Sequence, residues 1–431
     1  MDVWIKRNNL IDNIISYLFF ILVVGFFLFG RVSAHLNLKV FNLPVYVTEL
    51  FLISAVIIIF ISSVFLKDGR IFLDSKQRIE FLLFYIIFII SLVRGLISYR
   101  DIVFTLRQSA IIYYSIFYFL VPIILDNFKK IKIYFSVLVI CTSILALVRL
   151  FRIGILGLGS FGYYYISLSF IFLLFLSLLI KKQVLKKILY SLILIHLIII
   201  ILSEVRAAWM GLLSAILFII FIFFKIPVMR KNLKKILFLA ILAILILTII
   251  LPIFLISYPS SIEDIKDEFV SIYKFRDLET VSARNVMWRL FVWRDIIDLS
   301  LEKPILGYGF GVPFQSETLE KIGWTDYSGD EDINFTDPHN SYLSILFRTG
   351  FVGLLIFLII IFRFFKLSIN FILKCDNEKM RVYIASMLTT IVFILGTSFF
   401  MVVLEGPFLG IFLWINMGLV ISIIRIAKAD Q

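Results

Sequence analysis

Twelve long apolar runs restrict this chain to one class of fold. Each run is close to the roughly 20 residues that an α-helix needs to cross a hydrocarbon core about 30 Å thick. The chain of 431 residues is 61% hydrophobic and 16% charged, which is more apolar surface than a soluble domain can bury. We therefore expect an all-α polytopic membrane protein with about 12 transmembrane helices. The runs lie near residues 11–30, 44–66, 79–97, 105–125, 131–150, 158–180, 186–203, 207–225, 234–257, 339–362, 381–402 and 405–424.

Basic residues set the expected orientation, because the cytoplasmic loops of membrane proteins are enriched in Lys and Arg. With the N-terminus inside, cytoplasmic segments hold 25 of the 42 Lys and Arg residues, and 17 lie outside. Nine of those 17 lie in or beside one long loop, which carries little weight, so the short segments compare as 25 to 8. We expect both termini in the cytoplasm. The scattered basic residues do not indicate nucleic-acid binding.

One connection, residues 258–337, is much longer than the others. It lies on the expected outer side and separates a nine-helix region, 1–257, from a three-helix region, 338–431. It holds 16 Asp and Glu against 8 Lys and Arg, so it is acidic. Loops of this length are usually functional or disordered. The sequence of residues 282–304 favours an ordered structure in part of this loop.

Residues 282–304 of the loop indicate an amphipathic helix, with Ser282 as its cap and Pro304 after its end. Trp288 and Trp293 are typical of a helix at the membrane surface. A helix that only covers the bundle is the alternative. The expected apolar stripe consists of Met287, Leu290, Phe291, Ile297 and Leu301.

Three other features point away from common binding motifs. The glycines of PILGYGFGVPF, residues 304–314, follow an amphipathic helix and do not open a βαβ unit, so a tight turn with close backbone approach is expected. The acidic string at 325–337 lacks EF-hand spacing and is expected to be a solvated loop. Cys141 and Cys375 fall in a membrane run and a cytoplasmic turn, so no disulfide is expected.

His339 is the strongest candidate for chemistry. With Asp337 as N-cap and Pro338 at the first helical position, His339 would lie in the first turn of a helix at the outer interface. The helix dipole there disfavours the imidazolium form, and a neutral imidazole can accept a proton. The same helix start can bind an anion. A histidine that only hydrogen-bonds to the loop is the alternative, and His35 and His196 are expected to be structural.

Arginines gather at the same expected face. Arg206 begins a helix at or just within the outer interface, where a charge is costly and indicates function unless it pairs with Glu204 or reaches water. Arg284 and Arg289 lie on the expected loop helix. Guanidinium groups bind phosphate by paired hydrogen bonds. We therefore expect a phosphate-containing, membrane-borne substrate that enters from the outer leaflet. The other outward arginines are Arg94, Arg100, Arg107, Arg149 and Arg152.

Three segments resemble, in order, the O-antigen ligase and O-antigen polymerase superfamily. The first is SEVRAAWMG, which contains Arg206. The second is SARNVMWRLFVWRDIIDLSLEKPILGYGFGVPF, similar to an Arg…Trp…Pro-Ile-Leu-Gly-x-Gly pattern. The third is PHNSYLSILFRTGFVGLL, similar to a His-Asn-x-x-Leu…Gly pattern. The region that carries the resemblance spans about 186–362.

The resemblance implies a C-type glycosyltransferase-like fold and a metal-independent reaction, without cofactors, outside the cytoplasmic membrane. It implies a donor glycan on undecaprenyl pyrophosphate, and a glycan or lipid A core as acceptor. Membrane lipids and a chain-length regulator protein are further implied partners. The first outer loop, residues 31–44, contains no Asp or Glu, which argues against the metal-dependent oligosaccharyltransferase branch.

The resemblance also implies roles for individual residues. His339 would take the proton of the acceptor hydroxyl, and Arg206 and Arg284 would neutralise the charge that grows on pyrophosphate. Asn340 would orient the acceptor or the histidine. The remaining expected substrate contacts are Arg289, Trp288 and Asp337.

Polymerisation of surface-polysaccharide repeat units is the expected reaction, because many such systems need a polymerase even without lipopolysaccharide. Transfer to the lipid A core by a ligase is the alternative within the family. A lipid-linked glycan flippase is a more distant alternative. A transporter would place its charged residues along a central cavity, whereas here they gather at one face.

Overall fold

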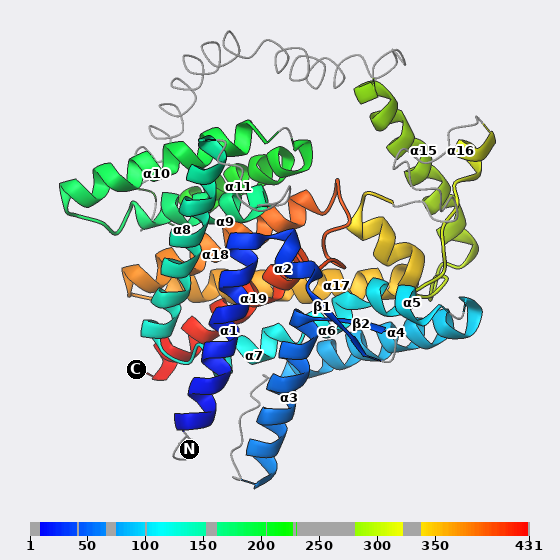
Figure 1. Ribbon diagram of the computed structural model, residues 1–431, viewed down its shortest axis with the longest axis horizontal. Helices are drawn as coiled ribbons and strands as arrows, with labels where there is room; N and C mark the ends of the chain where they lie inside the picture. The colour runs from blue at the N-terminus through cyan, green and yellow to red at the C-terminus, as the bar shows by residue number, and fades with distance from the viewer. Residues whose placement is uncertain are drawn as a thin grey trace.

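The computed structural model of the chain describes residues 9–40, 43–65, 75–99, 101–151, 162–203, 205–226, 230, 281–321 and 338–429. These residues form a helical bundle with one small β-hairpin (Figure 1). The N-terminal part contains α1 (Asn9–Phe29), α2 (Arg31–His35), α3 (Val47–Phe65), α4 (Ser75–Tyr99), α5 (Ile102–Gln108), α6 (Ala110–Tyr114) and α7 (Phe117–Ile124). The middle part contains α8 (Phe128–Leu150), α9 (Gly162–Leu176), α10 (Gln183–Ile201) and α11 (Arg206–Lys225). The C-terminal part contains α15 (Val281–Glu302), α16 (Glu317–Lys321), α17 (Ser341–Lys374), α18 (Glu378–Thr397) and α19 (Leu409–Ala429).

The helices agree with the predicted membrane class. Within the described part of the chain, seven helices are long and apolar enough to cross a membrane, or eight if one bent pair counts as a span. Shorter apolar helices lie at Asn13–Phe29, Val47–Ile58 and Gly162–Leu176. The predicted break at SEVR is present, because α10 ends at Ile201 and α11 begins at Arg206. The predicted run 234–257 lies outside the described residues.

The apolar run predicted near 105–125 is not one continuous helix. This stretch consists of α5, α6 and α7, and its two apolar parts meet at an angle of 46°. The hydroxyls of Ser109 and Ser115, at the two junctions, donate to the carbonyl oxygens of Leu106 and Ile112. Such local bonds compete with the helical ladder, so each serine favours a break.

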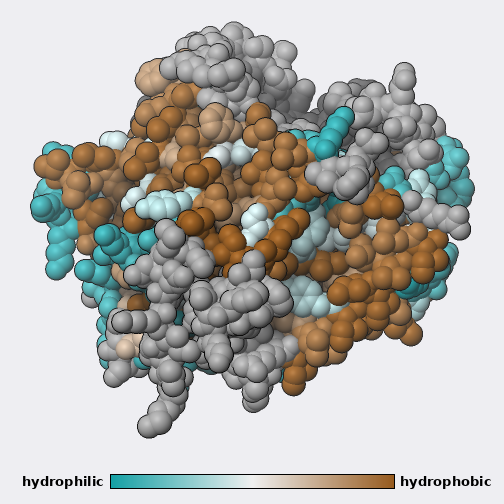
Figure 2. All heavy atoms as spheres, turned by 60° about the horizontal axis from the view of Figure 1, so that its bottom comes forward, coloured by the Kyte–Doolittle hydropathy of each residue, from teal (hydrophilic) through white to brown (hydrophobic). Residues whose placement is uncertain are grey.

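A broad hydrophobic surface surrounds the bundle. In Figure 2 hydrophobic residues cover most of the middle of the visible face, and hydrophilic residues gather toward its left and right margins. Many large apolar side chains are exposed on the long helices, among them Ile97 at 71% and Phe362 at 67%. In water such exposure would be unfavourable, whereas lipid accommodates it. The surface therefore matches a protein embedded in a bilayer.

Hydrogen bonds identify one end of the bundle. The ammonium of Lys130, at the start of α8, donates to Ser16 of α1 and to the carbonyl of Ile124 at the end of α7. The Ser422 hydroxyl, late in α19, donates to the carbonyl of Leu125. The beginning of α1 and the end of α19 therefore lie at the same end, which is the lower left of Figure 1, while α15 and α16 lie at the right.

The segment between α1 and α3 departs from the all-α prediction. Strands β1 (Asn37–Val40) and β2 (Leu43–Tyr46) form an antiparallel hairpin in which Asn37 pairs with Tyr46. The hairpin continues into α3, where the Glu49 carboxylate accepts hydrogen bonds from the backbone N–H of Tyr46 and the hydroxyl of Tyr113. Strands this short are hard to predict from sequence, because four residues show the alternation of apolar and polar side chains only twice.

The glycine-rich segment after α15 packs tightly against α17, as its spacing predicts. Tyr308 and Gly309 donate backbone hydrogen bonds to the carbonyls of Phe347 and Arg348. Gly307, Gly309 and Gly350 all have positive φ angles. A Cβ on Gly350 would lie 2.3 Å from the carbonyl oxygen of Ile305, so a larger residue cannot replace it without displacing the segment. These glycines thus allow the segment between α15 and α16 to pack closely on α17.

Candidate functional site

The N-terminus of α17 is capped by Asn340, and the predicted start at Asp337 and Pro338 is wrong. The Asn340 side-chain oxygen accepts hydrogen bonds from the backbone N–H groups of Tyr342, at 2.9 Å, and Leu343, at 3.1 Å. Helical geometry begins at Ser341, so His339 precedes the cap and is not in the first turn. Asn340 therefore caps the helix through its side-chain oxygen, and its expected role in orienting the acceptor or the histidine stays a prediction. Asp337 lies outside the described residues.

His339 sits in a constrained stretch of backbone at this helix start. Its φ is 45°, and it is the one non-glycine residue with positive φ in the described part of the chain. Such a conformation is uncommon but is adopted most readily by Asn, Asp and His. Directly before it, the carbonyl of Pro338 accepts a hydrogen bond of 2.8 Å from the indole of Trp293. The outer helix α15 thus fixes the segment that carries the histidine.

Trp288 is an aromatic neighbour of the histidine. The two ring centroids are 5.1 Å apart at an interplanar angle of 74°. Trp288 is held there by a small hydrophobic core in which it packs with Val292, Ile296 and residues of the following segment. The structure therefore brings together His339 and Trp288, which the sequence placed in two different segments.

Arg289, the residue after Trp288, is connected to the helix start through Tyr164 and Met401. It lies in electrostatic range of the Tyr164 hydroxyl on α9. That hydroxyl donates to the sulfur of Met401, 2.8 Å away. The carbonyl of Met401 in turn accepts a hydrogen bond from Ser341, the first residue of α17. A chain of contacts thus connects Arg289 and Tyr164 to the helix N-terminus that His339 precedes, and a cation near a helix N-terminus is suited to an anionic substrate.

The buried face of α15 differs from the predicted stripe. Trp288, Val292 and Ile296 form the buried row, whereas Leu290 and Ile297 are each 44% exposed. The described helix begins at Val281, so Ser282 lies inside it and is not its cap. Both rows recur at helical spacing, and the sequence pattern cannot distinguish which one meets protein.

The structure describes the surroundings of the other two predicted catalytic arginines, Arg206 and Arg284, in less detail. Arg206 is half-buried at the first residue of α11. About a turn and a half later, Gly211 lies against Thr397 near the end of α18, and Ser398 accepts a backbone hydrogen bond from Ser341. Arg206 is therefore at the same end of the bundle as the start of α17. Arg284 lies in α15 one turn before Trp288, and its side chain, like Glu204, is outside the described part.

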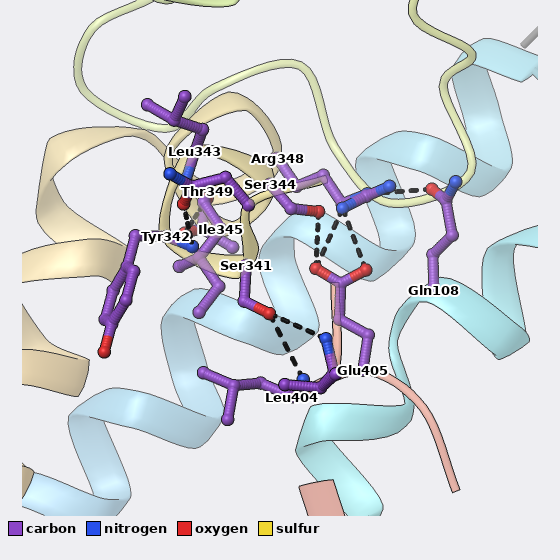
Figure 3. Close-up of polar contacts among 12 residues, drawn as sticks. Gln108, Ser341, Tyr342, Leu343, Ser344, Ile345, Arg348, Thr349, Leu404 and Glu405 are labelled. Carbon is purple, nitrogen blue, oxygen red and sulfur yellow. Dashed lines mark hydrogen bonds and ion pairs between the residues drawn. The ribbon is translucent and has the colours of Figure 1, made fainter. Parts of the chain in front are cut away.

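Sequence reasoning missed a buried ionic network directly beneath this site (Figure 3). The guanidinium of Arg348 donates to both carboxylate oxygens of Glu405, at 2.9 and 3.0 Å. Its Nε donates to the side-chain oxygen of Gln108, 2.9 Å away, which also accepts from the backbone N–H of Gly311. Ser344 donates to Glu405 at 2.5 Å. Four separate segments of the chain therefore meet at one charge pair.

The signal for this network was available in the sequence. Arg348 and Glu405 are single charges of opposite sign within the apolar stretches SILFRTGFV and MVVLEGPFL. A charge inside a membrane segment is costly and usually pairs with another. Each residue is less than a tenth exposed, as such pairing requires. Searching apolar runs for opposite lone charges would have found the pair.

Among the described residues there is no group of three or more His, Cys, Asp or Glu side chains that could hold a metal ion. The chemistry available at the helix start is instead an imidazole that can exchange a proton, nearby guanidinium groups that can bind phosphate, and aromatic faces that can stack on sugar rings.

The described helices and their site define a polytopic all-α membrane protein with an outer helix fixed on the N-terminus of a membrane helix. A family model described as O-antigen ligase matches residues 189–358, a span that includes Arg206, α15 and His339. The match confirms the resemblance to the O-antigen ligase and O-antigen polymerase superfamily over this part of the chain.

Individual relatives cover only part of the chain. A protein of Rickettsia conorii named "Putative polysaccharide ligase" is 35% identical over 82 residues, which is 18% of this chain and 19% of that protein. A protein of Rickettsia prowazekii with the same description is 32% identical over 96 residues, 22% of this chain and 23% of the relative. The matched part thus spans about a fifth of the length of these relatives.

Proposed function

We propose that this protein transfers a glycan from an undecaprenyl-pyrophosphate-linked donor to an acceptor hydroxyl at the outer face of the cytoplasmic membrane. The observation that carries the proposal is the position of His339. It precedes the N-terminus of α17 and contacts Trp288, the residue before Arg289, within the region that matches the O-antigen ligase model. The family match supports glycan transfer, and the membrane helices support a lipid-linked donor.

In the proposed reaction, the acceptor oxygen attacks the anomeric carbon of the donor. The bond between that carbon and the phosphate oxygen breaks, and pyrophosphate leaves with the electron pair. His339 takes the proton of the acceptor hydroxyl as general base. The guanidinium groups of Arg206, Arg284 and Arg289 bind the pyrophosphate and stabilise the charge it gains. Packing of α15 over the site excludes water, which would otherwise hydrolyse the donor.

We favour a growing repeat-unit glycan as the acceptor, so that the product is surface polysaccharide such as O-antigen or capsule. The second candidate is a ligase that transfers the glycan to lipid A core. It is favoured by the names of the Rickettsia relatives, both described as polysaccharide ligases. The two reactions share the donor and the chemistry proposed for His339, and they differ only in the acceptor.

Purified protein incubated with a lipid-linked repeat unit, with and without lipid A core, separates these possibilities. A polymerase forms longer lipid-linked chains from the donor alone, whereas a ligase forms product only when lipid A core is present. If an intact, folded preparation consumes no donor under either condition, the proposed transfer is wrong. A vesicle assay that shows movement of the donor across the membrane without a covalent product would indicate a flippase instead.

A further inference from the structure

The outer helix α15 is apolar on two opposite sides. On one side Trp288, Val292 and Ile296 are each at most 6% exposed, and they pack on α16 and the start of α17 through Phe314, Leu319 and Phe347. These three residues are four apart, which places them on one face of a helix. This inner face carries the contact between Trp288 and His339.

The outer face of α15 carries a second row of large aliphatic side chains. Leu290, Ile297 and Leu301 are 44, 44 and 60% exposed, and we refer to them as the outer stripe. With 3.6 residues per turn they fall opposite Trp288 and Val292. A helix at a protein–water boundary is polar on the face away from the core. The outer stripe therefore requires an apolar environment.

The outer stripe is continuous with the membrane-facing surface of α17. One turn beyond Leu301, Ile305 is 66% exposed. The backbone N–H of Phe351 donates to the carbonyl of Pro304 at 2.7 Å, which places Ile305 beside the start of the exposed face of α17. That face runs along a helix long and apolar enough to cross a membrane. Its exposed residues are Phe351, Leu355, Leu358 and Phe362, at 49, 58, 43 and 67%.

The charged residues of α15 fit the boundary between lipid tails and headgroups. Arg294 lies between Leu290 and Ile297 on the outer face, and its side chain is 76% exposed. It forms only a long ion pair of 3.8 Å with Asp298, itself 65% exposed, which leaves room for a phosphate partner. Trp293 lies at the margin of the stripe, where interfacial helices commonly place tryptophan.

We propose that the outer stripe of α15 is immersed among the acyl chains of the outer leaflet, with Arg294 at the level of the lipid phosphates. The helix then separates lipid, on one face, from His339, on the other. The candidate site is one helix diameter, about 10–12 Å, from the bilayer. A substrate with a lipid tail reaches the site without leaving the membrane. The lipid contact is independent of the proposed transfer reaction. Only the statement that a substrate with a lipid tail reaches the site from the membrane rests on the proposed function.

Fluorescence quenching tests the lipid contact directly. In a background with Cys141→Ser and Cys375→Ser, single cysteines replace Ile297 or Leu301, and each carries an environment-sensitive fluorophore. The full-length protein is reconstituted in phosphatidylethanolamine and phosphatidylglycerol vesicles that contain a lipid with a nitroxide on its acyl chain. Iodide serves as the aqueous quencher. Phe362→Cys on α17 is the matched control for lipid, and Glu302→Cys, on the polar side of α15, is the control for water.

The expected result is a blue-shifted emission for the probes at 297 and 301, strong quenching by the nitroxide lipid, and weak quenching by iodide, as for Phe362→Cys. Quenching by iodide to the extent seen for Glu302→Cys would overturn the proposal. Protection from both quenchers at every lipid-to-protein ratio would show that another segment of the chain covers the stripe. Protection only at low lipid content would show contact between two copies. If the probes at 297 and 301 give the same result, local misfolding of one variant is not its cause.

Discussion

At the scale of single residues, the site depends on two neighbours with different tasks. Asn340 caps α17 through two backbone hydrogen bonds, and His339 stays outside the helix with a positive φ. The division of roles has a physical origin, because asparagine is a strong N-cap and histidine tolerates the left-handed region better than most residues. The imidazole is thereby held next to the helix N-terminus, while Asn340 accepts the hydrogen bonds of the first turn.

Arg206 should act through the geometry of its guanidinium group. Replacement by lysine keeps the charge but loses the paired hydrogen bonds to phosphate. We expect Arg206→Gln to lower the rate of glycan transfer by about 10²–10³-fold, as for loss of one strong donor to a developing charge, and Arg206→Lys to recover only part of it. Single-turnover transfer measures both. Lys225→Gln, at the other end of α11, is the control, and a near-native rate for Arg206→Gln would remove this arginine from the site.

The buried pair of Arg348 and Glu405 should contribute to stability mainly by mutual neutralisation. Removing one partner leaves an uncompensated buried charge, so Arg348→Leu or Glu405→Leu alone should destabilise the protein by about 3–5 kcal/mol. The double variant should lose much less than the sum. Thermal unfolding in detergent, followed by tryptophan fluorescence, measures the three variants. Additive losses would mean that the two residues act independently. Such a result would contradict the ion pair of 2.9 Å between Arg348 and Glu405.

At the scale of elements, α15 and α16 form a unit joined by Asp295. Its carboxylate accepts hydrogen bonds from the hydroxyls of Ser316, at 2.5 Å, and Thr318, at 2.6 Å, and from the backbone N–H of Thr318, at 3.0 Å. Burial raises the pKa of Asp295, but these hydrogen bonds outweigh it and hold the pKa below its ordinary value. The ionised form is therefore the one that holds α16 in place.

The lowered pKa of Asp295 fixes the sign of a pH effect. Its contribution to stability is fully present above the ordinary aspartate pKa of about 3.9 and is lost as the pH falls through the lower folded-state pKa. Hydrogen exchange of Thr318 and Leu319, corrected for intrinsic rates, should show less protection near pH 3 than at pH 7. In Asp295→Asn, the same two amides should be weakly protected from exchange at both pH values. Asp298→Asn, on the exposed face, should match the native protein, and unchanged protection in Asp295→Asn would contradict this role.

The elements also show what could be predicted from the sequence and what could not. Apolar runs located the seven described helices that are long and apolar enough to cross a membrane, because length and hydropathy alone define a span, whereas the predicted number of twelve is not confirmed. The start of α17 was misplaced because Asp337–Pro338 and Asn340–Ser341 both resemble helix beginnings, and only tertiary contacts through Ser341 and Met401 decide between them. Likewise, α15 has two apolar rows, and only the packing with Phe347 selects the buried one. Residues paired across more than two hundred positions, such as Gln108 and Arg348, leave no local pattern.

At the scale of the whole molecule, the start of α1 and the end of α19 lie at the opposite end of the bundle from α15 and α16. We expect the first end to lie in the cytoplasm, because the short segments there hold the excess of basic residues. On this expectation the site faces outward, as the proposed reaction requires.

Cysteine labelling tests this orientation. In the cysteine-free background, Glu317→Cys on α16 and Lys379→Cys at the start of α18 both replace exposed residues. An impermeant maleimide should label Glu317→Cys in intact spheroplasts and Lys379→Cys only after lysis. The reverse labelling pattern would mean that the protein is inserted in the opposite orientation, with His339 on the cytoplasmic side.

The role of His339 is the central claim, and His339→Asn tests it most directly. Asparagine tolerates the same positive φ, so the backbone is retained, but its amide cannot accept the acceptor's proton. In single-turnover transfer from a lipid-linked donor at saturating acceptor, His339→Asn should be slower by about 10²–10⁴-fold while donor binding persists, and His35→Ala should remain near native. The native rate should fall as the pH drops through the titration range of histidine. A native-like rate and pH profile for His339→Asn would contradict the assignment of this histidine as the general base.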